Sequence, residues 1–230
     1  MLLSAGFGTR LRPLTNNTPK CLVEINGQPI LQIWLEKLAR LGVHEVLINT
    51  HYLSDQVISF VKQYESSMNI IVAHEEVLLG TAGTVLKNSS FVDTDCFLVH
   101  TDTYIQDHLE GFVSFHRQRE ILMFSAVGFK VRDPSNYGTF TLDDAGIISG
   151  FYEKVIDPPS NLASAACFLI RPVFIEWMKK TNPNALDFSS DILTKALCLG
   201  GVYETSLPVF DIGTIPSLRA CERYVNTAID

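Results

Sequence analysis

The order of apolar segments in the first half of the chain limits its possible folds most strongly. Segments 43–49, 69–73 and 96–101 have the β-branched, apolar composition of buried strands, and segments 29–42 and 54–64 carry apolar residues at helical spacing. Strands that alternate with crossover helices pair in parallel, and the helices pack against the sheet. We therefore expect an α/β fold whose mainly parallel sheet binds ligands beyond the carboxyl ends of its strands.

The pattern changes after residue 120. Four segments have the composition of strands joined by short turns, which indicates an antiparallel or mixed addition: 121–130, 138–142, 147–153 and 163–170. Three helical segments are expected to follow, at 172 onward, 188–199 and 216–229. Because the sequence shows no internal repeat and no low-complexity linker, we expect a single domain over residues 1–230.

Composition excludes several classes of protein. The chain has 230 residues, of which 47% are hydrophobic, so it can bury a sizeable core and is too apolar to be disordered. A formal charge of −7 argues against nucleic-acid binding, which needs a basic face. No apolar run is long enough to span a membrane, and the N-terminus lacks the layout of a signal peptide. We therefore expect a cytoplasmic protein with no nucleic-acid partner and no membrane contact.

The cysteines suggest neither a disulfide framework nor a zinc site. The chain has five of them, widely spread and without a C-x-x-C pair. We expect buried, reduced thiols.

A glycine-rich, cationic loop follows the first expected strand, at residues 1–3. Gly6 and Gly8 allow backbone N–H groups to turn inward and approach an anion closely. Arg10, Arg12 and Lys20 add full positive charges, and an arginine can hold two phosphate oxygens at once. The loop therefore predicts a polyphosphate site. Its G-x-G alone is equally compatible with a charged surface loop, because it completes neither the dinucleotide motif nor the P-loop.

The longer stretch is much more specific. A-G-x-G-T-R-L-R-P-L-T, which begins at Ala5, and the P-K-C-L that follows at 19–22 resemble the signature of the sugar nucleotidyltransferases, or NDP-sugar pyrophosphorylases. The resemblance implies a Rossmann-like mixed, mainly parallel sheet flanked by helices. It also implies a loop that covers a triphosphate, in which Arg10 and Lys20 are catalytic because they stabilise the phosphates. The nucleotide-binding residues implied in this loop are Ala5, Gly6, Gly8, Thr9 and Arg10.

Further matches extend along nearly the whole chain. Segment 75–83 resembles the base-reading E-x-x-P-L-G-T-A-G of that family, with Leu78 in place of proline, and it implies nucleotide contacts for Glu75, Gly80 and Thr81. The motifs Y-G at 137–138 and F-x-E-K at 151–154 resemble the sugar-binding motifs, and D-I-G-T occurs at 211–214. The substrate-binding residues implied are Tyr137, Gly138, Glu153, Lys154 and Ser164. Residues 1–120 would then be mainly nucleotide-binding, and residues 121–230 mainly sugar-phosphate-binding.

Two departures from the family pattern lie near the acceptor sugar. His100-Thr101 replaces the usual Asn-Gly, and Ser164-Ala165-Ala166 replaces the usual Asn-Ala-Gly. Both leave the identity of the sugar open. An exposed ion pair at a strand end is the alternative role for Glu153 and Lys154.

Two aspartates are expected to bind the metal that this chemistry needs. Asp102 follows segment 96–101 and Asp211 follows segment 206–210, so both would reach the ligand edge of the sheet. Mg²⁺ prefers oxygen ligands, so it can bind carboxylates of the protein and phosphate oxygens of the substrate. A structural aspartate at a strand end is the alternative for Asp102. The D-x-D at 93–95 precedes its strand instead, so we expect a solvated turn there.

The activity implied is transfer of a nucleotidyl group from a nucleoside triphosphate to a sugar 1-phosphate, with release of pyrophosphate, for surface glycan synthesis. Glu75 favours GTP, because a carboxylate only accepts hydrogen bonds and guanine offers adjacent N1–H and N2–H donors. The segment looks most like those of mannose-1-phosphate and heptose-1-phosphate guanylyltransferases. The alternatives are a UTP- or dTTP-using enzyme of the same fold and a regulatory homologue that binds the nucleotide sugar without turnover.

The resemblance leaves two features of the chain open. Few residues follow Asp211, so we expect no left-handed β-helix of the kind that some relatives append, and homo-oligomer formation stays open. The family's opening strand is longer than residues 1–3, which is compatible with a native start upstream of Met1.

Overall fold

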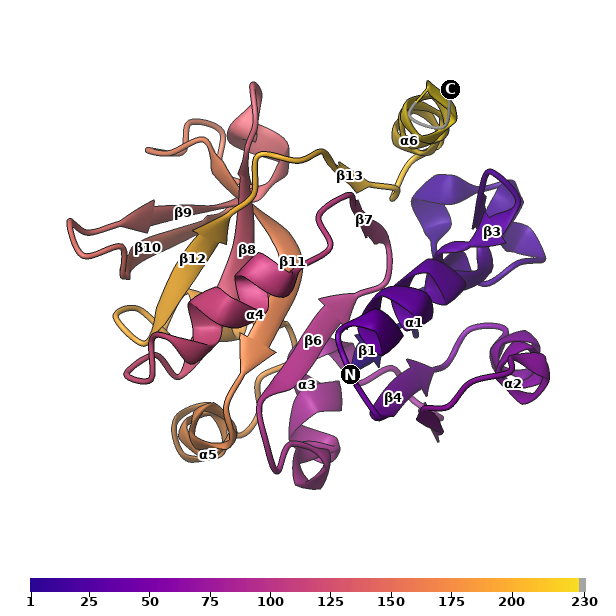
Figure 1. Cartoon of the computed structure of the whole chain (residues 1–230), viewed down its shortest axis with the longest axis horizontal. Helices are drawn as coiled ribbons and strands as arrows, with labels where there is room; N and C mark the ends of the chain where they lie inside the picture. The colour runs from indigo at the N-terminus through magenta and orange to yellow at the C-terminus, as the bar shows by residue number, and fades with distance from the viewer. Residues whose placement is uncertain (228–230) are drawn as a thin grey trace. The chain divides into compact units, whose positions relative to one another are not determined.

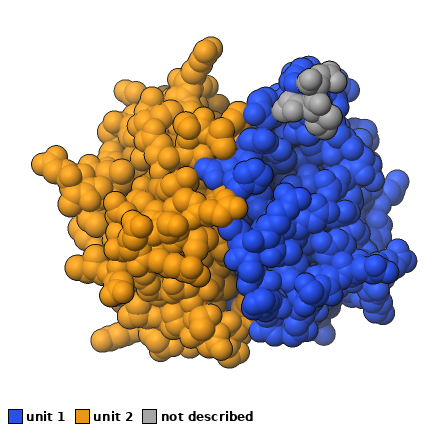
Figure 2. Space-filling view, in the orientation of Figure 1, with its two compact units in different colours: residues 1–78, 99–108, 209–230 blue, residues 79–98, 109–208 orange. Residues whose placement is uncertain are grey.

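The computed structural model describes residues 1–227, and the chain forms two compact units, coloured separately in Figure 2. Unit 1 contains residues 1–78, 99–108 and 209 onward, and unit 2 contains residues 79–98 and 109–208. The chain thus passes between the units four times, and neither unit is a continuous stretch. The boundaries between these units therefore differ from the boundary near residue 120, where the family resemblance implies a change from nucleotide binding to sugar-phosphate binding.

Unit 1 contains a four-stranded parallel sheet. β1 pairs in parallel with β4 and with the last residues of β6, and β4 pairs in parallel with β5. The bounds of these strands are β1 (Leu2–Leu3), β4 (Glu45–Thr50), β5 (Asn69–His74) and β6 (Cys96–His100). Helices α1 (Ile30–Arg40) and α2 (Ser54–Gln63) lie in the connections from β1 to β4 and from β4 to β5 (Figure 1). The predicted mainly parallel sheet is confirmed.

Helix α1 anchors the segment that carries Asp102. Its buried residues recur at helical spacing, as the sequence predicts, and they are Ile30, Leu31, Trp34, Leu35 and Leu38. Trp34 donates from its indole nitrogen to the carbonyl of Thr103 at 2.9 Å, and Lys37 donates from Nζ to the carbonyl of Ile105 at 2.7 Å. The helix therefore fixes the backbone directly after Asp102.

Two short antiparallel pairs complete unit 1. β7 (Thr103–Ile105) pairs with β13 (Val209–Asp211), so that Asp211 lies opposite Thr103. β2 (Glu24–Ile25) pairs with β3 (Gln28–Pro29). Helix α6 (Ile215–Thr227) follows β13, and the expected end of this helix at residue 229 lies outside the described residues.

Unit 2 contains the antiparallel part that the second half of the sequence predicts. β11 pairs antiparallel with β8 and β9, and β9 pairs antiparallel with β10, whereas β12 runs parallel to β8. The strands are β8 (Phe124–Lys130), β9 (Gly138–Leu142), β10 (Ile148–Glu153), β11 (Leu162–Ile170) and β12 (Gly200–Glu204). The helices are α3 (Gly80–Lys87), α4 (Glu110–Arg117) and α5 (Pro172–Thr181).

The helix expected at 188–199 was wrong in extent. Only residues Phe188–Leu193 form a helical turn, of the wide π type, and Gly200, expected as its stop, begins strand β12. A Cβ at Gly200 would lie 2.5 Å from Cε1 of Phe124 on the paired strand. The glycine is therefore needed for close packing between β12 and β8, which short-range sequence signals do not show.

The cysteines are free thiols, as expected, but not all are buried. Cys21, Cys167 and Cys221 are buried, Cys96 is half-buried and Cys198 is exposed. Cys198 lies at the turn before β12, where its backbone has a φ of 65°. No helix within residues 1–227 is long and apolar enough to cross a membrane.

A buried histidine in unit 2 joins α4 to β8. His116 is 1% exposed, and its Nδ1 lies 2.8 Å from Oγ of Ser125. Its Nε2 lies 3.5 Å from Oδ2 of Asp95, which also pairs with Arg171. Asp95 belongs to the D-x-D segment, an exposed bend before β6, as expected. Burial and the charge of Arg171 lower the pKa of His116 from 6.5 to about 4, although Asp95 partly opposes this shift.

This histidine is expected to make stability depend on pH. Between pH 6.5 and about 4 the unfolded chain binds a proton on residue 116 and the folded chain does not, so the free energy of unfolding falls as pH falls through that window. The full effect is on the order of 3 kcal/mol. Urea unfolding from pH 7 to 5 should show a steeper loss for the wild type than for His116→Gln, which cannot titrate. Parallel pH profiles would contradict this assignment.

Candidate functional site

The loop after β1 is a compact turn, fixed by the conformation of Gly8 and by a side-chain hydrogen bond from Thr15. Gly8 has a φ of 63°, a conformation that residues other than glycine rarely adopt, and a Cβ there would lie 2.9 Å from Cγ2 of Thr15. Thr15 donates from its hydroxyl to the Gly8 carbonyl at 2.7 Å. Gly6 has no other atoms within 4 Å of the place where a Cβ would lie, so an anion can approach the exposed backbone there.

His51 and Tyr52, which our sequence analysis did not predict as site residues, contact this loop. Tyr52 donates from its hydroxyl to the carbonyls of Thr15 at 3.0 Å and Asn16 at 3.1 Å. The exposed ring of Phe7 packs against the rings of His51 and Tyr52, with centroids 5.4 and 5.6 Å away. The sequence feature that could have predicted this contact is the aromatic pair His51-Tyr52, which directly follows β4 and so lies at the same edge of the sheet as the loop.

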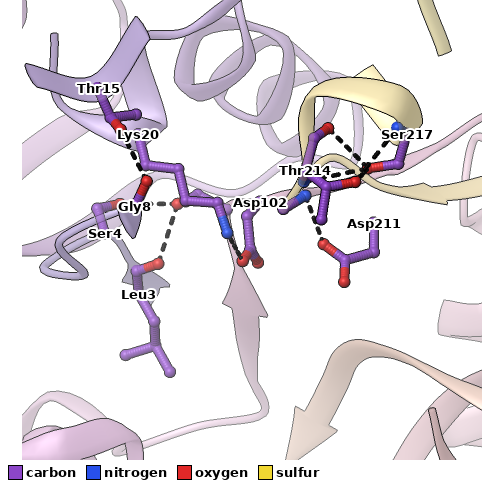
Figure 3. A network of polar contacts seen from close by, with 11 residues as sticks. Leu3, Ser4, Gly8, Thr15, Lys20, Asp102, Asp211, Thr214 and Ser217 are labelled. Carbon is purple, nitrogen blue, oxygen red and sulfur yellow. Dashed lines mark hydrogen bonds and ion pairs between the residues drawn. The ribbon is translucent and has the colours of Figure 1, made fainter. Parts of the chain in front are cut away.

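Lys20 and Asp102 form the central ion pair of the site (Figure 3). The Lys20 side chain is 14% exposed and that of Asp102 is 30% exposed, so the pair is partly shielded from water. Burial raises the pKa of the Asp102 carboxyl, but the charges of Lys20 and His100 and the hydrogen bond from Lys20 outweigh burial, so the pKa lies below its usual value. Asp102 is therefore ionised at neutral pH.

Asp211 lies beside Asp102. The antiparallel pairing of β13 with β7 is extended by a hydrogen bond from Ile212 N to the carbonyl of Asp102, at 2.9 Å. Asp211 Oδ1 accepts from Gly213 N at 2.7 Å, and Asp102 lies between Lys20 and Asp211 in Figure 3. The two expected metal ligands, far apart in sequence, are thus neighbours in unit 1.

Arg10 reaches the same place from the loop. A Cβ at Gly213 would lie 2.7 Å from Asp211 Oδ1 and 2.9 Å from Arg10 Nη2, so the guanidinium and this carboxylate face one small space. Arg10 and Lys20 therefore bring two cations, and Asp102 and Asp211 two carboxylates, to one edge of the sheet. Thr9 and Arg10 form an exposed single turn, and Ala5 is buried beneath the loop.

The donor set fits a hard divalent cation. Two carboxylates are too few for a cage made of protein alone, and within residues 1–227 no group of three or more His, Cys, Asp or Glu side chains could hold a metal. Mg²⁺ normally takes only one or two carboxylates and completes its shell with water and substrate phosphate oxygens. Asp102 and Asp211 match that requirement.

A row of polar side chains crosses the carboxyl ends of the strands of unit 1. Asn49 donates from Nδ2 to Glu75 Oε1 at 2.9 Å and accepts from Ser4 N with Oδ1 at 2.7 Å. Oγ of Ser4 lies 3.2 Å from Oγ1 of Thr101, which precedes Asp102. Glu75 is only 1% exposed. We call Glu75, Asn49, Ser4 and Thr101 the polar row. The contact between Glu75 and the base stays a prediction, because a ligand would have to reach this buried carboxylate.

Gly80 and Thr81 lie in unit 2, where they hold the segment that starts at Leu186. Gly80 has a φ of 77°, and a Cβ there would overlap the carbonyl oxygen of Leu186. The Thr81 hydroxyl accepts from Phe188 N at 2.7 Å. Ala82 N donates to the Leu186 carbonyl at 2.9 Å. The G-T-A part of the segment that resembles a nucleotide-binding motif therefore has a structural role, and its nucleotide contacts stay a prediction.

Gly80→Ala is expected to lower the free energy of unfolding by about 3 kcal/mol, because it combines a strained φ with overlap of backbone atoms. Gly83→Ala is the milder comparison, since the position is helical and a Cβ there would be crowded by Leu79 Cβ at 3.2 Å but would overlap no backbone atoms. Helix propensity favours alanine at such a position by up to about 1 kcal/mol. Urea titrations of both variants measure the difference. Equal stabilities would contradict the overlap.

The expected sugar-binding residues of unit 2 come together on neighbouring strands. Gly138 begins β9 and pairs with Glu153 at the end of β10, and a Cβ at Gly138 would lie 2.5 Å from Glu153 Oε2. Lys154 N donates to the Tyr137 carbonyl at 3.2 Å. Ser164 lies on β11, one residue after Ala163, which pairs with Thr139. Lys154 Nζ also lies 3.2 Å from Glu153 Oε1, so the ion pair named as the alternative is present.

The chain is similar in sequence to known proteins. The protein family described as "Nucleotidyl transferase" matches residues 1–227. The chain is 33% identical over 181 residues to the mannose-1-phosphate guanylyltransferase catalytic subunit beta of Drosophila pseudoobscura pseudoobscura, which covers 76% of this chain and 48% of that protein. It is 29% identical over 225 residues to mannose-1-phosphate guanylyltransferase 1 of Arabidopsis thaliana, which covers 93% of this chain and 60% of that protein. The chain spans about half the length of the curated relatives it matches.

A solved structure has the same fold. The crystal structure of HddC from Yersinia pseudotuberculosis superposes with a TM-score of 0.80 at 23% identity, over 97% of each chain. At this identity the similarity shows the fold alone, which confirms the expected mixed, mainly parallel sheet flanked by helices.

Proposed function

Because the chain belongs to the nucleotidyl transferase family, we propose that it joins a nucleoside triphosphate to a sugar 1-phosphate and releases pyrophosphate. The observation that carries this proposal is the meeting of the glycine loop, Lys20, Asp102 and Asp211 at the carboxyl edge of the parallel strands in unit 1. Transfer from a polyphosphate needs cations and carboxylates that can hold a divalent metal, and two cations and two carboxylates at this edge support the proposal.

The reaction needs no general base. An oxygen of the sugar phosphate, already ionised, attacks the α-phosphorus in line, and the bond from that phosphorus to the bridging oxygen breaks so that pyrophosphate leaves. Both reactants are anions, so the work of the chain is to position them and to neutralise their charge. Arg10 and Lys20 hold phosphate oxygens, and the backbone at Gly6 and Gly8 approaches them closely.

Asp102 and Asp211 are the residues that would hold Mg²⁺. When bound, the ion would supply Lewis-acid stabilisation of charge on the phosphate oxygens. The Lys20–Asp102 pair keeps Asp102 ionised, as a metal ligand must be. It also keeps the Lys20 ammonium at the place where the phosphates would lie.

In unit 2, Lys154 would hold the sugar phosphate and Glu153 a sugar hydroxyl. Tyr137 and Gly138, at the start of β9, and Ser164, on the neighbouring strand β11, would contact the same sugar. The curated relatives favour GTP and mannose 1-phosphate, since their names specify a mannose-1-phosphate guanylyltransferase. The product would be an activated sugar for surface glycan synthesis, made in the cytoplasm, where nucleoside triphosphates are available.

Pyrophosphate release tests the proposal. The purified chain is incubated with Mg²⁺, each of GTP, UTP and dTTP, and a panel of sugar 1-phosphates that includes mannose 1-phosphate. We expect pyrophosphate release, highest with GTP, that stops when EDTA is added. Turnover with only UTP or dTTP would show that the chain uses that nucleotide and not GTP. No turnover over the whole panel, with tight binding of a nucleotide sugar, would overturn the catalytic proposal in favour of a regulatory binding protein.

A further inference from the structure

The second arm of the glycine loop (residues 4–18) is held by side chains from the start of α2. Tyr52 shares its hydroxyl hydrogen between the carbonyls of Thr15 at 3.0 Å and Asn16 at 3.1 Å. Four positions later, Gln56 donates from Nε2 to the carbonyl of Asn17 at 2.9 Å. Three successive carbonyls of the loop are therefore bound by the segment that follows β4.

Tyr52 is itself held in place within unit 1. Its half-buried ring packs against the ring of Phe7, with centroids 5.6 Å apart. The next residue, Leu53, has a φ of 50°, a conformation that residues with a side chain rarely adopt. Backbone strain of this kind is concentrated at functional sites. The ring contact and this turn together fix the position of the Tyr52 hydroxyl.

Thr15 links Tyr52 to the glycine end of the loop (Figure 3). It is completely buried, and its hydroxyl donates to the Gly8 carbonyl at 2.7 Å, which also accepts from Leu11 N at 2.9 Å. Because the peptide between Gly8 and Thr9 is planar and trans, its N–H points away from the Gly8 carbonyl. The Thr9 N–H is thus directed away from Thr15.

We propose that Tyr52 is a positioning residue that acts through Thr15 to fix the Gly8 carbonyl. The same peptide then presents the Thr9 N–H, beside the exposed Arg10, to the polyphosphate. An N–H group and a guanidinium stabilise an anion only when both are aimed at it. This inference rests on the proposed function, which assigns the phosphates to the loop. We call Tyr52, Thr15 and Gly8 the loop relay.

Tyr52→Phe tests the relay, because it removes the hydroxyl and keeps the ring that contacts Phe7. We expect kcat at saturating substrates and Mg²⁺ to fall about 10-fold, less than the roughly 100-fold that a displacement of about 1 Å can cost, because Gln56 still holds the loop. The KM for the sugar 1-phosphate should change by less than about 2-fold, since unit 2 is proposed to hold that reactant.

The matched control is Tyr64→Phe, at the end of α2 in the same unit. Tyr64 is half-buried, and its ring stacks on that of Phe60 with centroids 5.8 Å apart. The variant removes the same hydroxyl group from a tyrosine outside the relay, so it should keep the kcat of the wild type.

A double-mutant cycle tests the path through Thr15. Thr15→Val removes the hydroxyl that reaches Gly8 and keeps the shape of the side chain. In that background, Tyr52→Phe should lower kcat by less than about 2-fold, because the two changes break the same relay. A merely structural role of Tyr52 would not make its effect on kcat depend on the Thr15 hydroxyl at a temperature where all four proteins are folded. Wild-type kcat for Tyr52→Phe, or an equal loss in both backgrounds, would overturn the proposal.

Failure of the proposed function is recognised separately, because the wild type would then release no pyrophosphate. Calorimetry with inorganic tripolyphosphate and Mg²⁺ tests the relay without turnover. The wild type should bind tripolyphosphate, and Tyr52→Phe should bind it about 5-fold more weakly, as loss of one hydrogen bond to the loop predicts. Equal affinity of the two proteins, or no binding by the wild type, would overturn the proposal.

Discussion

Asp211→Asn is expected to lower kcat by about 100- to 1,000-fold while leaving the fold intact. The substitution removes the charge that a divalent cation and its phosphates require, and charge stabilisation of this kind contributes about 10²–10³-fold per group. The Asn side chain keeps an oxygen that can accept from Gly213 N, the contact that Asp211 makes at 2.7 Å. Pyrophosphate release at saturating GTP, mannose 1-phosphate and Mg²⁺ measures the effect.

The matched control for Asp211→Asn is Asp144→Asn, in the exposed turn between β9 and β10. It makes the same change in net charge at an exposed turn residue that has no proposed role in the site, and it should keep full activity. Thermal unfolding of both variants shows whether the fold is retained. Full activity of Asp211→Asn with a normal melting curve would remove this aspartate from the site.

Lys20→Met is expected to lower kcat/KM by about 10³–10⁴-fold, within the range lost when a cation that stabilises a transferring phosphoryl group is removed. Two effects combine. The phosphates lose a partly buried ammonium, and Asp102 loses the partner that lowers its carboxyl pKa. That pKa should therefore rise in the variant, so the remaining activity should require a higher pH than that of the wild type.

Lys62→Met serves as the control for Lys20→Met, because Lys62 is an exposed residue of α2 in the same unit. Arg at position 20 offers a second comparison, since it keeps the charge but not the compact ammonium. We expect partial activity for Lys20→Arg. If Lys20→Met and Lys62→Met have the same kcat/KM, the central ion pair has no part in the chemistry.

Local patterns in the sequence predict the parallel sheet because its strands and crossover helices are long enough to show their periodicity. Segments 69–73 and 138–142 coincide closely with β5 and β9. The aspartates at 102 and 211 are expected at one ligand edge of the sheet, and they are neighbours. The rule that carboxyl ends of strands gather at one edge explains only Asp102, because Asp211 lies on β13, which pairs antiparallel with β7 outside the parallel sheet.

Other features depend on contacts between distant residues, which local patterns do not contain. Strand β12 exists because Gly200 and Gly201 pack against β8, and two adjacent glycines on their own look like a break. The burial of Glu75 depends on Asn49, 26 positions earlier, and a motif that matches a nucleotide-binding family gives no sign of it. Asn49 itself offered a signal, as a polar side chain inside an apolar strand.

The repeated passage of the chain between its units affects how the protein is made on the ribosome. The glycine loop and Lys20 emerge early, whereas the segment that bears Asp211 is synthesised only after the whole of unit 2. β7 therefore waits for its partner strand until translation of about a hundred intervening residues is complete. A nascent chain at that stage holds the cations of the proposed site without its second carboxylate, so the proposed nucleotidyl transfer would begin only after synthesis has passed residue 211.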